Sequence, residues 1–123
     1  MPECRLPIRV YIEDTDAGGI VYYVNYLKYF ERARTELIRS LGVDKTAVME
    51  DGSVFVVTSV AIDYLAPARL DDQLEAVAEV VNSGAATIEF RQSVVRSGIE
   101  LASGQVRVAL ADGESGKPKR MPQ

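Results

Sequence analysis

Residues 9–42 read RVYIEDTDAGGIVYYVNYLKYFERARTELIRSLG, and their pattern is the strongest indication of the fold. From Tyr26 onward its apolar positions recur every three and four residues, as they do on one face of an α-helix. These positions are Leu27, Phe30, Ala33, Leu37, Ile38 and Leu41. Gly42 follows directly, and glycine is typical of the first position beyond a helix. The spacing therefore predicts one long amphipathic helix that ends at Leu41.

Strand patterns lie on both sides of this helix. Residues 6–12 alternate apolar and polar side chains, which predicts a strand that buries Ile8, Val10 and Ile12. Four more runs rich in β-branched and apolar residues follow, at 54–64, 73–81, 87–95 and 101–110. Short turns that contain serine and glycine separate the last three runs, and these turns predict an antiparallel meander.

The order of these elements is strand, helix and four strands. A single helix cannot cover both faces of a five-stranded sheet, so we expect the sheet to wrap around the helix. A second copy of the chain would then cover the remaining surface or edge. The pattern contains no repeat or linker, so residues 1–123 are expected to form one domain, with a flexible polar tail from about residue 112.

The composition argues against several classes of function. The 14 basic and 18 acidic residues give a net charge of −4, which argues against general nucleic-acid binding. No apolar run approaches the roughly 20 residues that cross a bilayer, and the N-terminus lacks the apolar core of a secretory signal. A single cysteine, Cys4, allows no intramolecular disulfide and suits a reducing compartment. We therefore expect a cytoplasmic protein without a transmembrane segment.

The most informative absence is that of histidine, because the chain contains none. Ser-His-Asp and Cys-His catalysis are thereby excluded, and the commonest transition-metal ligand is missing. We expect no cofactor and no metal site. Any chemistry must use carboxylates, hydroxyls, amides and cations.

Asp16 is the carboxylate that the sequence places closest to the start of the helix, just before a Gly-Gly pair. Such a carboxylate offers an oxygen that attacks or activates water, and the helix start offers N–H groups for a developing oxyanion. Gly18 and Gly19 let the chain turn sharply and let a substrate approach the backbone. By residue type alone, Asp16 could instead be a turn residue, and we expect Asp14 to bond within the turn.

Residues 9–42 closely resemble the N-terminal motif of YbgC-like acyl-CoA thioesterases, which belong to the 4-hydroxybenzoyl-CoA thioesterase group of the hotdog-fold superfamily. Residues 62–75, IDYLAPARLDDQLE, are similar to the middle segment of that group. The resemblance implies an α+β hotdog fold, in which a five-stranded antiparallel sheet wraps around one long central helix. It also implies hydrolysis of an acyl-CoA thioester by a homodimer or homotetramer.

The resemblance further implies roles for individual residues. Asp16 falls on the catalytic carboxylate of the DxDxxG motif of the family. The backbone N–H of Tyr23 falls on the donor that holds the thioester carbonyl at the start of the central helix. Tyr23 stands where many YbgC-like members have histidine, and other members of the wider group carry an aromatic residue there. Residues 81–86 lack the basic cluster that some 4-hydroxybenzoyl-CoA thioesterases carry near this turn.

Four other side chains are candidates for substrate contact. Tyr22 could line the pocket, and Asn25 could touch the acyl group or bond to local backbone. Thr58 and Ser59 interrupt an apolar strand, where a buried hydroxyl needs a partner. One of these hydroxyls could face the thioester, as in related enzymes, or both could bond across strands.

Two other functions stay open from the sequence alone. A hotdog hydratase or dehydratase would act on similar thioesters, but such chemistry usually needs a histidine paired with an acid. A non-catalytic acyl-thioester binding module is the second alternative, and the substitution at Tyr23 is compatible with it. The sequence also leaves open the acyl group, small or medium, and the route, in which Asp16 attacks the carbonyl carbon or activates a water molecule.

Overall fold

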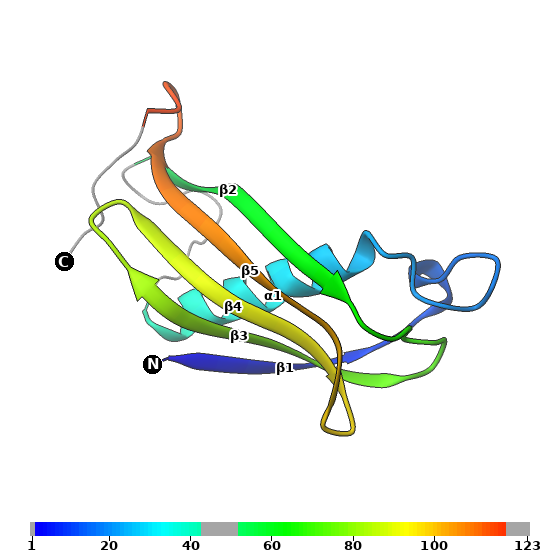
Figure 1. Ribbon diagram of the computed structural model, residues 1–123. Coiled ribbons are helices and arrows are strands. Elements are labelled where there is room, and N and C mark those ends of the chain that lie inside the picture. Colours follow the sequence, from blue (N-terminus) through cyan, green and yellow to red (C-terminus); the bar gives the residue numbers. More distant parts are fainter. Residues whose placement is uncertain (1, 43–51, 118–123) are drawn as a thin grey trace.

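The computed structural model describes residues 2–42 and 52–117, which form one curved sheet around one long helix (Figure 1). The elements in chain order are β1 (Glu3–Arg9), the 3-10 helix η1 (Ile12–Asp14), α1 (Asn25–Ser40), β2 (Ser53–Tyr64), β3 (Gln73–Ser83), β4 (Thr87–Arg96) and β5 (Ile99–Asp112). The order across the sheet is β1-β3-β4-β5-β2, and every neighbouring pair is antiparallel. This confirms the predicted five-stranded antiparallel sheet around one helix. Within the described residues, no helix is long and apolar enough to cross a membrane.

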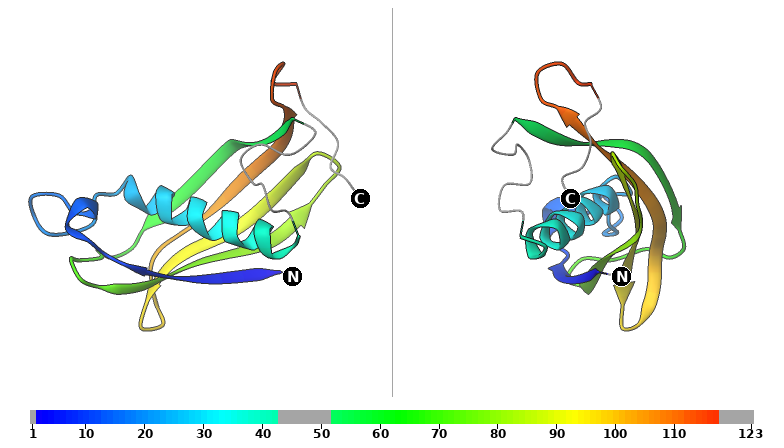
Figure 2. Two further views of the ribbon diagram at one scale, coloured as in Figure 1. Left: turned by 180° about the vertical axis from the view of Figure 1, so that it is seen from behind. Right: turned by 90° about the vertical axis from the view of Figure 1, so that its left-hand side faces the viewer.

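The helix α1 lies in the hollow of the sheet, and Figure 2 shows it nearly end-on with the strands arching around it. It packs on β1, β3 and β4. Ala76 and Ala78 of β3 are fully buried beneath it, and such small side chains let a helix lie close to a sheet. The buried face of the helix comprises Asn25, Tyr26, Tyr29, Phe30, Ala33, Leu37 and Ile38.

Two leucines of the predicted helix face are exposed. Leu41 lies just beyond the last helical residue, and Leu27 lies one position after the buried Tyr26, about 100° around the helix. Tyr29 takes a core position that the pattern did not assign to it. The other members of the predicted face are buried, so the helical period was predicted correctly.

One polar side chain in the core joins the helix to the sheet. Gln92 of β4 is fully buried, and its Nε2 donates to the Phe30 carbonyl oxygen at 2.8 Å. Its Oε1 accepts from Arg34 Nη1 at 3.0 Å. Because both ends of the amide are satisfied, its burial carries no unpaired polar atom. These bonds fix the rotation of α1 over the sheet.

Residues with positive φ lie after the helix and in the turn between β4 and β5. The sequence predicts a helix end and a hairpin at these two places. Gly42, the second residue after the last helical residue Ser40, has φ +98°. Ser97 and Gly98 have φ of 51° and 80°, which suits a two-residue turn between β4 and β5. The turn between β3 and β4 is closed by the Gly84 N–H, which donates to the Thr87 carbonyl at 2.8 Å. The predicted meander of the last three strands is confirmed.

The first strand differs from its prediction, because β1 starts and ends three residues before the predicted range of 6–12. Ile8 and Val10 are buried as predicted, but Ile12 is 75% exposed and belongs to η1. The Asp14 carboxylate accepts the Tyr11 N–H at 2.9 Å. This bond turns the chain into η1, so the alternation of buried and exposed residues stops after Val10.

The last strand continues beyond its predicted end, to Asp112. Residues 112–117 form a turn in which the Asp112 N–H donates to the Lys117 carbonyl at 2.8 Å. The Gly113 N–H donates to the Gly52 carbonyl at 2.9 Å. The rest of the predicted tail, 118–123, lies outside the described residues.

Candidate active site

A small hairpin of residues 14–22, which we call the Asp16 hairpin, leads into α1. Thr15 and Val21 face each other in an antiparallel bridge. The Asp16 N–H donates to the Ile20 carbonyl at 2.9 Å, and the Gly19 N–H donates back to the Asp16 carbonyl at 3.1 Å. Gly19 has φ +77°, a conformation that side chains other than glycine rarely adopt. The predicted sharp turn at the glycine pair is therefore present.

The Asp16 carboxylate lies on the exposed side of this hairpin. Its Oδ1 accepts the Gly18 N–H at 2.9 Å, and the residue as a whole is exposed. The bond holds the side chain over the turn and leaves Oδ2 with no partner among the described residues. In a single chain the carboxylate thus faces outward, where a substrate or a second protomer has access to it.

The start of α1 presents unpaired backbone N–H groups close to the same hairpin. The Tyr22 N–H donates to the Asp14 carbonyl at 3.0 Å and the Asn25 N–H to the Tyr22 carbonyl at 2.8 Å. Between them, the N–H groups of Tyr23 and Val24 donate to no acceptor in the described part of the chain. The first turn of the helix carries no acidic side chain. Free N–H groups and the helix dipole make such an end attractive for an anion.

Asn25 links the start of α1 to the first residue of the Asp16 hairpin. Its side chain is buried, and its Nδ2 donates to the Asp14 carbonyl oxygen at 2.8 Å. The same oxygen accepts the Tyr22 N–H. The first residue of α1 thus ties the helix start to the segment that carries Asp16. The structure places the Asn25 amide on local backbone, one of the two roles that the sequence left open.

Asp14 serves the local fold, as expected. Besides accepting the Tyr11 N–H, its carboxylate lies beside the hydroxyl of Tyr29, which is buried under the hairpin. Burial, and then the negative charge of Asp14, raise the pKa of Tyr29 far above its ordinary value. The hydroxyl therefore stays protonated at neutral pH.

An apolar groove of about 270 Å³ opens beside the helix start. We call it the tyrosine groove, and its lining residues are Ile20, Val21, Tyr23, Tyr26, Tyr64, Leu65, Ala66 and Pro67. The ring of Tyr64, at the end of β2, lies 5.9 Å from that of Tyr23 at 85° and 5.4 Å from that of Tyr26. The Tyr26 hydroxyl accepts the Ala68 N–H at 2.9 Å, which holds the segment after β2 against the helix. Tyr23 therefore has its amide at the helix start and its ring in the groove.

The candidate substrate residues divide into two groups in space. Gly18, Gly19, Tyr22 and Asn25 lie in the Asp16 hairpin or at the start of α1, near Asp16 and Tyr23.

Thr58 and Ser59 lie in the middle of β2, and both are exposed. The strand has an irregularity at this point, and the Thr58 hydroxyl donates to the Arg107 carbonyl at 3.3 Å. Five residues of extended chain, about 17 Å, separate Ser59 from the Tyr64 ring. Within one chain these two hydroxyls do not join the site.

Sequence reasoning missed Tyr64 and the loop of residues 65–72 that follows it. This loop packs on the Asp16 hairpin, because the Val21 N–H donates to the Ala68 carbonyl at 2.8 Å and the Leu70 N–H to the Gly19 carbonyl at 3.1 Å. The signal that could have found them was the resemblance of residues 62–75 to a family motif. This segment has no helical or strand periodicity of its own. Within the part of the chain that the structure describes, no three acidic or cysteine side chains gather closely enough to hold a metal ion.

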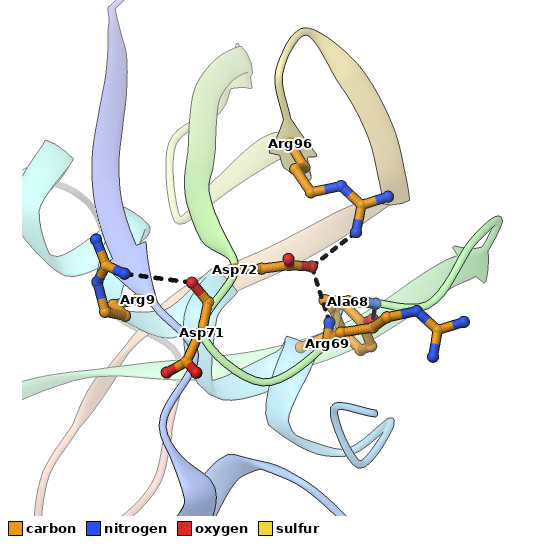
Figure 3. A network of polar contacts seen from close by, with 7 residues as sticks. Arg9, Ala68, Arg69, Asp71, Asp72 and Arg96 are labelled. Carbon is orange, nitrogen blue, oxygen red and sulfur yellow. Dashed lines mark hydrogen bonds and ion pairs between the residues drawn. The ribbon is translucent and has the colours of Figure 1, made fainter. Parts of the chain in front are cut away.

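A polar network holds the 65–72 loop in place (Figure 3). Asp72 Oδ2 accepts the Arg69 N–H at 2.9 Å and Arg96 Nη1 at 2.7 Å. Arg9 Nη1 donates to the Asp71 carbonyl at 3.3 Å. Asp71 itself has φ +69°, an uncommon conformation that Asp and Asn tolerate better than most residues. Burial raises the pKa of Asp72, but the Arg69 N–H and the Arg96 guanidinium outweigh it and hold this pKa below its ordinary value of 3.8.

Replacing Asp72 should therefore weaken the protein at neutral pH and not in acid. A carboxyl group whose pKa is lowered by folding contributes stability above its ordinary pKa and loses it as the pH falls through the folded value. We expect Asp72→Asn to lower the free energy of unfolding by about 1 kcal/mol at pH 7. The difference should shrink below pH 3.8. Urea unfolding followed by circular dichroism at pH 7 and pH 3 measures it, with Asp71→Asn as the matched control. Equal midpoints for Asp72→Asn and the unmodified protein at pH 7 would contradict the assignment.

Comparison with known proteins gives consistent matches. A family model described as the thioesterase superfamily matches residues 18–103. The acyl-CoA thioesterase YbgC of Haemophilus influenzae is 45% identical over 118 residues, which cover 95% of this chain and 87% of that protein. The acyl-CoA thioester hydrolase YbgC of Escherichia coli O6:H1 is 40% identical over 120 residues, which cover 97% and 90%. The crystal structure of a probable thioesterase from Bartonella henselae has a TM-score of 0.87 at 32% identity and covers 99% of this chain and 100% of that one.

Proposed function

The chain belongs to the thioesterase superfamily and to its YbgC-like group of thioester hydrolases, and we propose that it hydrolyses a small or medium acyl-CoA to the free acid and CoA. The Asp16 carboxylate and the Tyr23 N–H are the proposed reacting groups. One observation carries this proposal. The hairpin that bears Asp16 is hydrogen-bonded to a helix start whose Tyr23 N–H has no acceptor among the described residues.

The chemistry follows from what a thioester needs. Attack at the carbonyl carbon builds negative charge on the carbonyl oxygen, and one well-placed N–H donor stabilises that charge by about 3 kcal/mol. Asp16 either attacks the carbon itself, giving a mixed anhydride that water then hydrolyses, or removes a proton from an attacking water. In both routes the C–S bond breaks and CoA leaves as a thiolate that then takes up a proton. The chain contains no imidazole, so Asp16 is the proposed base or nucleophile.

The size and lining of the tyrosine groove suit a short or flat acyl group. It is lined by three tyrosine rings and by aliphatic side chains, and its volume of about 270 Å³ is small for a ligand site. Tyr23 both borders the groove and supplies the proposed oxyanion donor. An acyl group in the groove would therefore carry its carbonyl toward the helix start.

The exposed edge of β2 supports self-association. β2 pairs with β5 on one side only, so its other edge is unpaired within the described residues. Its exposed apolar side chains are Val56, Val57, Val60 and Tyr64. A long apolar edge strand is a template for pairing with another chain. We infer a homodimer, alone or as half of a homotetramer, in which Thr58 and Ser59 lie in the interface. A monomeric mass in sedimentation equilibrium would contradict this.

A thiol-release screen tests the proposed activity. We expect the protein to release free CoA from short aliphatic or aromatic acyl-CoA esters, at rates that fall as the acyl chain outgrows the groove. Saturable binding without thiol release would favour a binding module. Loss of the conjugated absorbance of an enoyl-CoA, with CoA still esterified, would favour a hydratase. The cytoplasm is the expected location on the ground of the single cysteine, Cys4.

A further inference from the structure

Asp16, Ile20 and Arg69 lie in one row across three short extended segments. Asp16 faces Ile20 within the Asp16 hairpin, where its N–H bonds to the Ile20 carbonyl. Ile20 in turn faces Arg69 in an antiparallel bridge. Residues that face each other across antiparallel segments project from the same side. The side chains of Asp16 and Arg69 therefore share one face, with Ile20 between them.

The burial of the neighbouring residues agrees with this register. Val21 and Ala68, each one position along from the row, are buried against the core. Asp16 and Arg69 are exposed, and Ile20 is half-buried at the rim of the tyrosine groove. The row thus faces outward, on the side from which a substrate reaches Asp16.

Arg69 is held firmly by its backbone while its guanidinium makes no bond. The Arg69 N–H donates to Asp72, and the adjoining Ala68 and Leu70 are tied to the helix and the hairpin. Arg9 and Arg96 donate to the same loop, as Figure 3 shows. The Arg69 guanidinium has no hydrogen bond or ion pair in the described part of the chain. The Arg69 charge contributes to lowering the pKa of Asp72, but the hydrogen bond and ion pair at Asp72 Oδ2 come from Arg96, so the Arg69 guanidinium keeps its donors for a ligand.

We propose that the Arg69 guanidinium binds a phosphate group of the CoA moiety while the thioester lies at Asp16. This inference rests on the proposed function. A guanidinium donates two parallel hydrogen bonds to a phosphate and stays charged at every relevant pH. The chain has a net charge of −4, Asp14 and Asp16 lie on the Asp16 hairpin, and Glu13 directly precedes it. A multiply charged anion needs a local cation to approach such a surface.

The spacing of the row suits a site for the distal part of the substrate. Neighbouring strands lie about 4.8 Å apart, so two steps across the row separate the Asp16 and Arg69 backbones by about 10 Å. An anion held by Arg69 is thus kept away from the attacking carboxylate. The phosphates of CoA are joined to the thioester by a long flexible arm, which can cover this separation. Arg69 would bind the substrate without touching the reacting atoms.

Two thioesters of the same acyl group separate this role from others. One is the acyl-CoA, and the other is the acyl N-acetylcysteamine thioester, which has no phosphate. For Arg69→Ala we expect KM for the acyl-CoA to rise about tenfold while kcat changes less than twofold. Hydrolysis of the phosphate-free thioester should be unchanged. Arg69→Lys should recover part of the loss, since it keeps the charge and loses the paired donors. Arg39→Ala, at the far end of α1, is the matched control for loss of an exposed arginine.

Binding of free CoA tests the subsite without any turnover. Calorimetry should give about tenfold weaker CoA binding for Arg69→Ala than for the unmodified protein, and dephospho-CoA tells whether the 3′-phosphate or the diphosphate is bound. If Arg69→Ala hydrolysed both thioesters equally more slowly, or hydrolysed both as the unmodified protein does, the subsite would be overturned. If the unmodified protein released no thiol from any ester, the proposed function would fail. Calorimetry alone would then test the subsite. Absent CoA binding, or CoA binding that is unchanged in Arg69→Ala, would overturn it.

Discussion

Asp16→Asn is expected to slow acyl-CoA hydrolysis by about 100-fold or more and to leave the fold intact. An amide neither attacks a carbonyl carbon nor removes a proton from water, so both proposed routes fail in this variant. The amide oxygen of asparagine can still accept the Gly18 N–H that Asp16 Oδ1 accepts. The Asp16 hairpin should therefore keep its shape. The residual rate would come from binding and from the Tyr23 N–H.

Thiol release under saturating acyl-CoA measures this effect as kcat. Glu13→Gln is the matched control, because it removes an exposed carboxylate from the same segment and its side chain has no hydrogen bond within the described residues. We expect it to change kcat less than twofold. Circular dichroism and sedimentation of both variants check the fold and the assembly. If Asp16→Asn turned over at the unmodified rate, Asp16 would have no part in the reaction.

The helix and strands of this protein could be predicted from the sequence because their signals are local. Phe30, Leu37 and Ile38 recur with the helical period, and each is buried where that period predicts. Alternation failed only at Ile12, where a side-chain bond from Asp14 to the Tyr11 N–H turns the chain. Such a bond depends on one rotamer of one residue, and no period in the sequence records it.

The candidate site could be predicted only in part, because some of its residues lie far from Asp16 in the sequence. Asp16 lies in a hairpin of nine residues and Tyr23 directly follows that hairpin, so one motif carries both. Tyr64 and Arg69 reach the same place through pairing of the 65–72 loop with Ile20, across about fifty residues of sequence. Local patterns do not encode such pairing, so neither residue was selected.

Thr58 and Ser59 are two candidate substrate residues whose role depends on what covers β2. Two hydroxyls in an apolar strand suggested a buried polar function, but the middle of β2 is exposed in the single chain. The strand lies at the edge of the sheet beyond β5, and the helix packs on β1, β3 and β4 instead. Whether these hydroxyls meet a substrate therefore depends on the partner that covers this edge, which stays a prediction.

Gly104→Ala should destabilise the protein by about 3 kcal/mol or more, through the contact between β2 and β5. Gly104 lies opposite Ile62 in this pair of strands. A Cβ atom built on Gly104 would overlap the Ala61 carbonyl oxygen and lie 3.0 Å from the Ile62 Cα. Both neighbours are backbone atoms of a paired strand, so neither can move without breaking the ladder. A methyl group here must therefore push β2 away from β5.

The damage should also reach the site, because β2 ends at Tyr64, whose ring borders the tyrosine groove. Leu65 follows it and donates its N–H to the Leu101 carbonyl of β5 at 2.8 Å. Displacing β2 would move Tyr64 away from Tyr23, so KM should rise even at temperatures where the variant is folded. Urea unfolding measures the stability, and acyl-CoA titration measures KM.

Gly84→Ala is the control that separates this contact from a general effect of adding a methyl group. A Cβ on Gly84 would lie 3.4 Å from the Thr87 side-chain oxygen, an ordinary contact at the end of a small side chain. Its expected cost is under about 1 kcal/mol. A Gly104→Ala variant as stable as Gly84→Ala would mean that β2 can shift without loss. The groove would then not depend on the β2–β5 register, and the placement of Tyr64 beside Tyr23 would need another cause.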